Sequence, residues 1–134
     1  MPLFYFLVTF SWCFSVMADT PENILLNYAV EAKRENPAFV TFDARRGDVF
    51  FHEKHGGEWS CSSCHTDNPS DMGRHVVTLK TIHPMRAGAD SDRFQDPHKV
   101  EKWFKRNCKD VLSRECTALE KGDVLTYLLS VQKP

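Results

Sequence analysis

The chain has 134 residues, in which 17 Lys and Arg residues nearly balance 18 Asp and Glu residues, so that its net charge is −1. This length predicts a single domain. The charge balance argues against a nucleic acid as the partner, because nucleic-acid-binding proteins neutralise phosphates with an excess of Lys and Arg. A domain of this size buries only about two thirds of the surface of its unfolded chain, so a bound apolar group or a covalent cross-link would add useful stability.

Residues 1–18 have the features of an export signal. They contain no charged side chain, an apolar run extends from Leu3 to Val16, and Ala18 is the small residue that would precede cleavage. The run is shorter than the about 20 residues of a membrane-spanning helix. We therefore expect a signal peptide at 1–18 and an exported domain at 19–134, with a retained N-terminal anchor as the alternative.

The first predicted helix runs from Pro21 to about Glu35, with Thr20 as its N-cap and proline at the favoured first position. Asn36-Pro37 ends this helix, because the residue before a proline avoids the helical conformation. A second helix is predicted from about Asp43 toward the cysteine motif. The apolar residues of the first helix that recur at helical spacing, and that we expect to face the core, are Ile24, Leu25, Tyr28 and Ala32.

Cys61-Ser62-Ser63-Cys64-His65 is the attachment motif of c-type haem. Two thiols three positions apart can each form a thioether with one vinyl group of a porphyrin, and the imidazole that follows can bind the iron. A thioredoxin-like pair would need a strand-then-helix context, and a structural zinc site would need four ligands. The motif therefore predicts one haem c, covalently bound through Cys61 and Cys64, with His65 as the proximal ligand.

A loop with at most one short helix is predicted for residues 66–96, because they are rich in Pro, Gly, Asp and Ser. A further helix should begin after Asp96 and run to about Cys108. Within it Val100, Trp103 and Asn107 share one face, which Val and Trp mark as buried. The Asn107 amide, which needs a partner there, is either a helix cap or a ligand of the iron.

The opposite face of the same helix is basic. A solvent-exposed helix face is the ordinary explanation, and a docking surface for an acidic redox partner is the alternative. The residues of this stripe are His98, Lys102, Lys105 and Lys109.

Of the five cysteines, Cys13 would be removed with the signal peptide, so Cys108 and Cys116 remain after haem attachment. In an oxidising compartment such a pair is expected to form a disulfide, the alternative being two free buried thiols. A capping box, Thr117-Ala118-Leu119-Glu120, opens the last predicted helix, which runs to about Val131. Its apolar residues on one side are Val124, Leu125, Leu128 and Leu129.

The ligand on the second axial position of the iron would decide the function. Methionine or histidine would give an electron carrier, whereas an open or weakly held position would bind a small ligand. Met85 follows a proline, as does the methionine ligand of class I cytochromes c, but a whole helix separates it from the last helix, which in that class directly follows the ligand loop. The candidate ligands are Met72, Met85, His52, His55, His75, His83, His98 and Asn107.

The terminal helices resemble those of class I cytochromes c. Gly47 and Phe51 have the Gly-x-x-x-Phe spacing of the N-terminal helix of that class, and Tyr127 is similar to an aromatic residue of its C-terminal helix. Glycine lets the two helices cross closely because it has no side chain. The resemblance implies an all-α, class I cytochrome c-like fold with about four helices around one haem.

The chain also resembles the sphaeroides haem protein family, which is related to cytochrome c double-prime. The resemblance rests on residues 100–108, which include Arg106-Asn107-Cys108, on 114–117, on Lys121 and on 123–125, with Asp92-Arg93-Phe94 also in agreement. It implies a periplasmic protein in which Asn107 binds ferric iron and leaves on reduction, so that O2, NO or CO can bind. It further implies a disulfide between Cys108 and Cys116.

The same resemblance implies a dihaem cytochrome c and a membrane b-type cytochrome as electron donors, and we expect a monomer. Two alternatives from other functional classes stay open. One is a six-coordinate electron-transfer cytochrome c. The other is an enzyme that reduces oxygen, peroxide or a nitrogen species.

A first prediction follows from the motif alone. Because two thioether bonds survive unfolding, haem staining of a denaturing gel should mark the band of the exported protein. A Cys61→Ser, Cys64→Ser variant should lose the stain. If acid acetone extracts the colour from the unmodified protein, the haem is not covalently attached.

Overall fold

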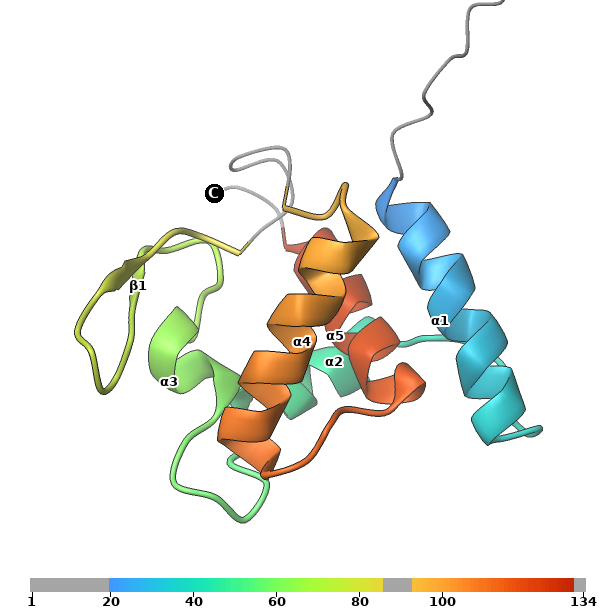
Figure 1. Cartoon of the computed structure of the whole chain (residues 1–134), viewed down its shortest axis with the longest axis horizontal. Helices are drawn as coiled ribbons and strands as arrows, with labels where there is room; N and C mark the ends of the chain where they lie inside the picture. Colours follow the sequence, from blue (N-terminus) through green and yellow to red (C-terminus); the bar gives the residue numbers. More distant parts are fainter. Residues whose placement is uncertain (1–19, 86–92, 132–134) are drawn as a thin grey trace, which may run out of the picture.

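The structure is a computed structural model that describes residues 20–85 and 93–131. It is helical apart from one short hairpin (Figure 1). The predicted signal peptide at 1–18 lies outside the described residues. No helix among the described residues is both long enough and apolar enough to cross a membrane. In chain order the elements are α1 (Pro21–Glu35), α2 (Ala44–His52), α3 (Cys61–His65), β1 (Gly73–Arg74), β2 (Thr81–Ile82), α4 (Pro97–Leu112) and α5 (Ala118–Ser130).

The predicted starts of the helices are confirmed, because each has a side-chain cap. The Thr20 hydroxyl accepts a hydrogen bond from the backbone N–H of Asn23 at α1, and Asp43 accepts one from Arg46 at α2. At α5 the Thr117 and Glu120 side chains form a reciprocal capping box. Such caps satisfy backbone N–H groups that have no partner within the helix.

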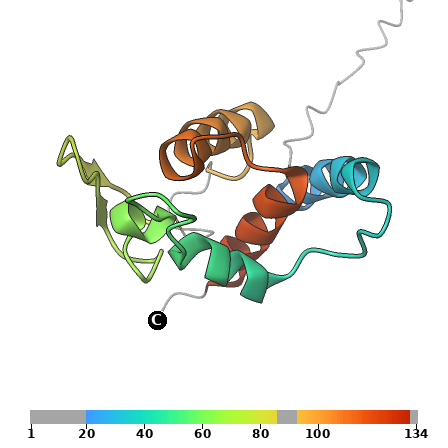
Figure 2. The same cartoon turned by 90° about the horizontal axis from the view of Figure 1, so that it is seen from below.

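Helices α2 and α5 cross with their backbones in close contact. A Cβ atom placed on Gly47 would lie 2.0 Å from the carbonyl oxygen of Asp123, so no other residue fits at this position without moving α5. The buried Asp123 carboxylate accepts hydrogen bonds of 2.8 Å from both Nε and a terminal nitrogen of Arg46, and one of 2.7 Å from the backbone N–H of Asp43. Figure 2 shows α2 lying across α5.

The core forms where α1, α2, α4 and α5 meet. Leu125 and Leu128 of α5 are almost completely buried, and Phe51 of α2 packs beside them, with its ring 5.6 Å from that of Tyr127. The apolar residues of this cluster are Ile24, Tyr28, Phe51, Met85, Phe94, Val100, Val124, Leu125 and Leu128. This confirms the apolar faces predicted for the first and last helices.

Helix α4 is one turn longer than predicted. It continues past Cys108 to Leu112, and Ser113 ends it in the left-handed conformation with φ 58°. The sequence has neither glycine nor proline at this point, so the usual signals for a helix end are missing. Asn107 therefore lies inside the helix, five residues before its last residue.

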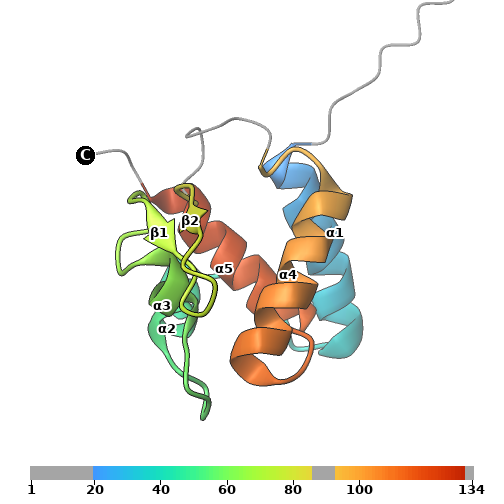
Figure 3. The same ribbon diagram turned by 60° about the vertical axis from the view of Figure 1, so that its left-hand side comes forward.

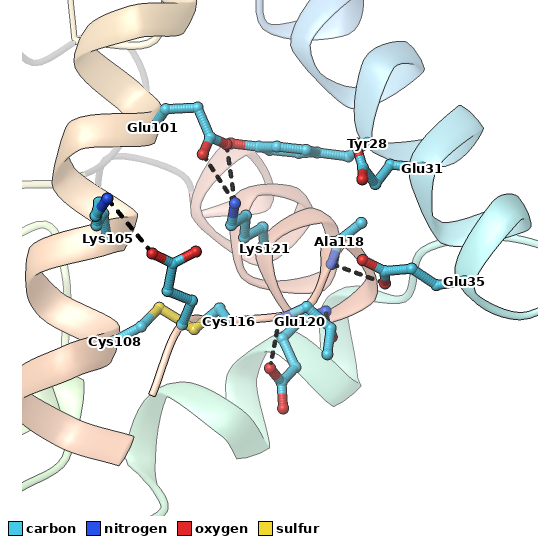
Figure 4. Close-up of polar contacts among 12 residues, drawn as sticks. Tyr28, Glu31, Glu35, Glu101, Lys105, Cys108, Cys116, Ala118, Glu120 and Lys121 are labelled. Carbon is cyan, nitrogen blue, oxygen red and sulfur yellow. Dashed lines mark hydrogen bonds and ion pairs between the residues drawn. A yellow bond between two sulfur atoms is a disulfide. The ribbon is translucent and has the colours of Figure 1, made fainter. Parts of the chain in front are cut away.

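Covalent and polar links attach α4 to its neighbours (Figure 4). Cys108 forms a disulfide with Cys116 in the segment before α5, with a Cα–Cα distance of 5.6 Å. Glu101 accepts a hydrogen bond of 2.5 Å from the Tyr28 hydroxyl of α1 and one of 2.8 Å from Lys121 Nζ of α5. Thus α4 is joined to α1 and α5 at its middle and to the segment before α5 near its end.

The segment between α3 and α4, for which a loop with at most one short helix was predicted, contains a short hairpin. Gly73 pairs with Ile82 and Arg74 with Thr81, and no helix occurs in 66–85 or 93–96. A Cβ atom on Gly73 would lie 2.3 Å from the carbonyl oxygen of Cys64, so this glycine lets the hairpin pack directly on α3. Figure 3 shows the hairpin and α3 on one side of α5 and α4 on the other.

The disulfide gives a prediction about stability. A loop of this length should contribute about 2 to 3 kcal/mol by restricting the unfolded chain. Cys108→Ser with Cys116→Ser should lower the free energy of unfolding by this amount in urea titrations of the holoprotein. Thr78→Ala with Thr81→Ala, which removes two exposed hydroxyls from the hairpin, is the control and should cost less. A protein that alkylates fully without reductant would contradict the bond.

Candidate functional site

A single helical turn presents the cysteine motif. Ser60 caps α3 by accepting a hydrogen bond of 3.2 Å from the backbone N–H of Ser63, while the Ser63 hydroxyl accepts one of 2.9 Å from the N–H of Ser60. The helix ends at His65, because Thr66 has a φ of 64°. Cys61, Cys64 and His65 therefore sit on one rigid turn.

This turn forms one wall of a cavity, called here the first cavity. The opposite wall comes from α4, and the hairpin closes one side. The residues that line the first cavity are Trp59, Ser60, Cys61, Cys64, His65, His75, Val76, Ile82, Asn107, Asp110 and Val111. The structure thus brings together all four of the site residues predicted from the sequence.

A second cavity lies on the other side of Asn107, which lines both. Its walls are mainly apolar, with Arg93 as the one charged contribution among the described residues. They are Met85, Arg93, Phe94, Val100, Trp103, Phe104, Asn107 and Leu128. Asn107 thus lines both the first cavity and the second cavity.

Burial favours the neutral forms of two side chains of the first cavity, His65 and Cys61. Burial, with smaller contributions from the positive charges of Arg93 and His75, lowers the pKa of His65 to about 4. Burial raises the pKa of the Cys61 thiol to about 11. At neutral pH the imidazole is therefore uncharged, which is the form that binds a metal ion.

Burial and hydrogen bonding separate the candidate axial ligands. Met72, His83 and His98 are exposed to solvent. The His52 ring is bound to two backbone carbonyl oxygens, those of Asp48 at 2.9 Å and Asp67 at 3.0 Å, and His55 Nε2 lies 2.8 Å from the carbonyl oxygen of Phe50. The candidates that line a cavity are His75, Met85 and Asn107.

These three residues differ in how they are held. His75 lies on the hairpin, beside the cysteine motif, where its Nδ1 accepts from the N–H groups of Val77 and Thr78 at 3.2 Å. Met85 is buried, and its backbone N–H donates to the carbonyl of Pro69, in the segment that follows the motif. Asn107 comes from α4, across the first cavity. Asn107 and His65 therefore line the same cavity from different helices.

The helix-cap explanation of Asn107 is wrong, because Ser113 is the C-cap of α4. No hydrogen bond joins the Asn107 amide to another side chain or to the backbone within the described residues 20–85 and 93–131. An amide that is half-buried in this way remains available to a ligand.

The prediction that Trp103 is buried is also wrong. Val100 is 4% exposed, as expected, but Trp103 is 40% exposed, since it lies at the edge of the face that α4 presents to the core. The guanidinium carbon of Arg93 lies 4.5 Å from the centre of its ring. In the sequence, Arg93 was noted only as part of the resemblance to a known family. No pattern of neighbouring residues predicted that it lines the second cavity.

The residues of the site fit a haem. Two thiols and a neutral imidazole occupy one wall, and apolar side chains form most of the remaining surface, as a porphyrin face requires. Among the described residues no three His, Cys, Asp or Glu side chains gather to hold a bare metal ion. A closed zinc site at Cys61 and Cys64 would lack the donors that such a site needs.

Comparison with known proteins agrees with this geometry. Residues 37–128 match the family described as "Domain of unknown function (DUF1924)". Cytochrome c″ of Methylophilus methylotrophus is 36% identical over 117 residues, which cover 84% of this chain and 81% of that protein. Cytochrome c-type protein SHP of Cereibacter sphaeroides is 38% identical over 118 residues, covering 85% and 87%.

Solved structures of the same two proteins share the fold. The solution structure of cytochrome c″ from Methylophilus methylotrophus, which concerns the structural basis of haem-ligand detachment, has a TM-score of 0.75 at 36% identity and covers 85% of this chain and 95% of that one. The structure of oxidised SHP, an oxygen-binding cytochrome c, has a TM-score of 0.72 at 36% identity and covers 82% and 96%. The class I cytochrome-like fold predicted from the sequence is thereby confirmed.

The position of Met85 leads to a prediction. Its backbone is attached to the segment that follows His65, so we expect its side chain to pack as part of the wall and not to bind the iron. Met85→Leu, which keeps the size and apolar character of the side chain, should leave the ferric absorption spectrum nearly unchanged. A thioether-to-iron charge-transfer band that disappears in this variant would contradict the expectation.

Proposed function

The chain belongs to the DUF1924 family and to the sphaeroides haem protein family of c-type cytochromes, and on this premise we propose that it is a redox-gated binder of diatomic ligands. It carries one haem c, bound covalently through Cys61 and Cys64. In this proposal His65 is the proximal ligand, and Asn107 is a sixth ligand that is released on reduction. The released position then accepts O2, NO or CO.

Haem c, when bound, supplies an iron that alternates between ferric and ferrous states and can accept a small ligand at an open axial position. His65 provides a neutral nitrogen held on the rigid α3 turn. Asn107 provides a neutral amide, which is a weaker donor than imidazole and is best suited to the harder ferric ion. Its release therefore costs little after reduction.

The observation that carries the proposal is the position of Asn107. It lines both cavities, faces the cysteine motif across the first one, and has an amide that caps no helix. The next residue, Cys108, is joined to Cys116, which limits how far this part of α4 can move. Release is therefore expected to be a local side-chain movement and not an unfolding of the helix.

The relatives support the choice of ligand class. SHP is described as an oxygen-binding cytochrome c, and cytochrome c″ as a protein whose haem ligand detaches. Both properties are combined in the proposed cycle of this chain. The apolar walls of the second cavity, formed in part by Phe94, Val100 and Leu128, would suit a small uncharged ligand.

We place the protein in the periplasm, with a dihaem cytochrome c and a membrane b-type cytochrome as electron donors. The uncharged apolar segment at 1–18 supports export. A disulfide between Cys108 and Cys116 is in keeping with an oxidising compartment.

A second candidate function is a plain electron shuttle. Met85 is 9% exposed and lines the second cavity together with Asn107, so a thioether is present near the position that a sixth ligand would take. A permanently bound methionine would make the iron six-coordinate in both redox states and would exclude diatomic ligands.

Asn107 variants separate the two functions. Asn107→Ala should give a ferric form that binds azide at least about tenfold more tightly, because a bond worth at least about 1.4 kcal/mol no longer competes. Its ferrous form should still bind carbon monoxide. Asn107→His should shift the haem toward low spin and slow carbon monoxide binding, because imidazole is the stronger donor. Titrations followed by absorption measure each quantity.

The matched control is Asn27→Ala, which removes an exposed asparagine from α1 and should change none of these quantities. If Asn107→Ala leaves the ferric spectrum and azide affinity as they are, the amide is not a ligand. The electron shuttle then becomes the better function.

A further inference from the structure

The outward face of α4 carries a concentration of positive charge that the whole chain, with a net charge of −1, does not have. All of its basic side chains are exposed to solvent, and they lie opposite the buried residues Val100 and Cys108. The residues of this surface, called here the α4 basic face, are His98, Lys99, Lys102, Lys105, Arg106 and Lys109.

Only two of the five Lys and Arg side chains of this face form an ion pair within the part of the chain that the structure describes. Lys99 Nζ lies 3.7 Å from a carboxylate oxygen of Asp96. Lys105, which is labelled in Figure 4, has its Nζ 3.5 Å from a carboxylate oxygen of Glu115. Lys102, Arg106 and Lys109 form no ion pair with any residue of 20–85 or 93–131. Exposed pairs such as the first two are worth little, so the face keeps most of its positive potential.

An aromatic residue borders this face. Trp103 is 40% exposed, and it follows Lys102 directly and precedes Arg106 by one turn. Its other side lines the second cavity, where Arg93 stacks on its ring. Trp and Arg are the residue types that most often dominate the binding energy of protein interfaces. Trp103 thus connects the basic face with the site that contains Asn107.

We propose that the α4 basic face, with Trp103 at its border, is the docking surface for an acidic electron-donor protein. The inference rests on the proposed function, because it assumes that the protein is reduced in its cycle. In the complex the donor gives up one electron and this protein takes up one, so no bond forms and no proton needs to move. An α-helix is about 10 Å across, so a donor on this face is separated from the first cavity by one helix.

The positive charge would suit an acidic protein or an anionic membrane, and the packing of α4 favours the protein. A helix that binds at a membrane surface inserts its apolar face among the lipids. The apolar face of α4 is already packed in the core, with Val100, Cys108 and Val111 all less than a tenth exposed. An acidic protein needs only the charges and a contact with Trp103, and both are accessible.

The test compares two variants that lose the same charge. One is Lys102→Gln, Arg106→Gln, Lys109→Gln, and the control is Lys33→Gln, Arg45→Gln, Lys54→Gln, which removes three exposed cations from other surfaces. The probe is an acidic plant-type [2Fe–2S] ferredoxin. Stopped-flow absorption measures the reduction of each ferric holoprotein by the reduced probe, and calorimetry measures binding of the oxidised probe.

The α4 variant should be reduced about tenfold more slowly at about 10 mM ionic strength, where charges act over long distances. Its affinity for the oxidised probe should fall by a similar factor, and high salt should remove both differences. The control should stay close to the unmodified protein. If both variants are slowed equally, the rate of reduction depends only on net charge, and the proposal is overturned. If neither variant is slowed, the rate does not depend on these charges, and the proposal is also overturned.

Two further measurements keep the alternatives apart. The first is sedimentation with vesicles of phosphatidylglycerol. If the vesicles capture the unmodified protein but not the α4 variant, and the substitutions do not change reduction by the ferredoxin probe, the face binds a membrane and the proposal is overturned. Carbon monoxide binding after reduction with dithionite tests the proposed function by itself. If the reduced protein does not bind carbon monoxide, the proposed function is wrong, but a difference between the two variants in reduction would still support the docking surface.

Discussion

The close approach of α2 to the backbone of α5 is the constraint on which the rest of this structure depends. The backbone carbonyl of Asp123 leaves no room for a side chain at position 47. The buried Asp123 carboxylate accepts its hydrogen bonds from Arg46 and from the backbone N–H of Asp43, at the start of α2. A buried carboxylate without such partners would cost several kcal/mol. The sequence can satisfy it only when the two helices cross at this point. The crossing fixes the direction in which α2 leads toward Trp59 and the motif, and therefore sets one wall of the site.

The opposite wall is held in a different way. Helix α4 contributes Val100 and Phe104 to the core, but its orientation depends on a few specific links: Glu101 with Tyr28 and Lys121 in the middle, and the disulfide near the end (Figure 4). Burial raises the pKa of Tyr28 far above its usual value, with the Glu101 carboxylate adding to the effect, so the phenol stays protonated and keeps donating its hydrogen bond. Both walls of the site are thus attached to α5, one by the close backbone contact at Asp123 and the other by the bond between Lys121 and Glu101.

The sequence predicts those features of the structure that are determined by residues close together in the chain. Helix starts could be predicted because Thr20, Asp43, Asp96 and Thr117 act within one turn of their own positions. The end of α4 could not, because Ser113 takes a left-handed conformation that its residue type does not favour. The hairpin was missed because strands of two residues carry no periodicity. The haem motif could be recognised since its three functional residues are contiguous. The exposure of Trp103 and the position of Arg93 depend on tertiary packing that no local pattern contains.

On the proposed function, the position of Asn107 would separate ligand release from electron delivery on the two sides of α4. Asn107 and the α4 basic face lie on opposite sides of α4, and the helix itself is held at Glu101 and Cys108, on either side of the amide along the chain. A partner bound to Lys102, Arg106 and Lys109 therefore has no need to displace the helix in order to deliver an electron. Conversely, a rotation of the Asn107 side chain changes nothing on the outer face. On the proposed function, the rate of reduction is set by charges on one side of α4 and the ligand equilibrium by one amide on the other, so that each can change by substitution without altering the other.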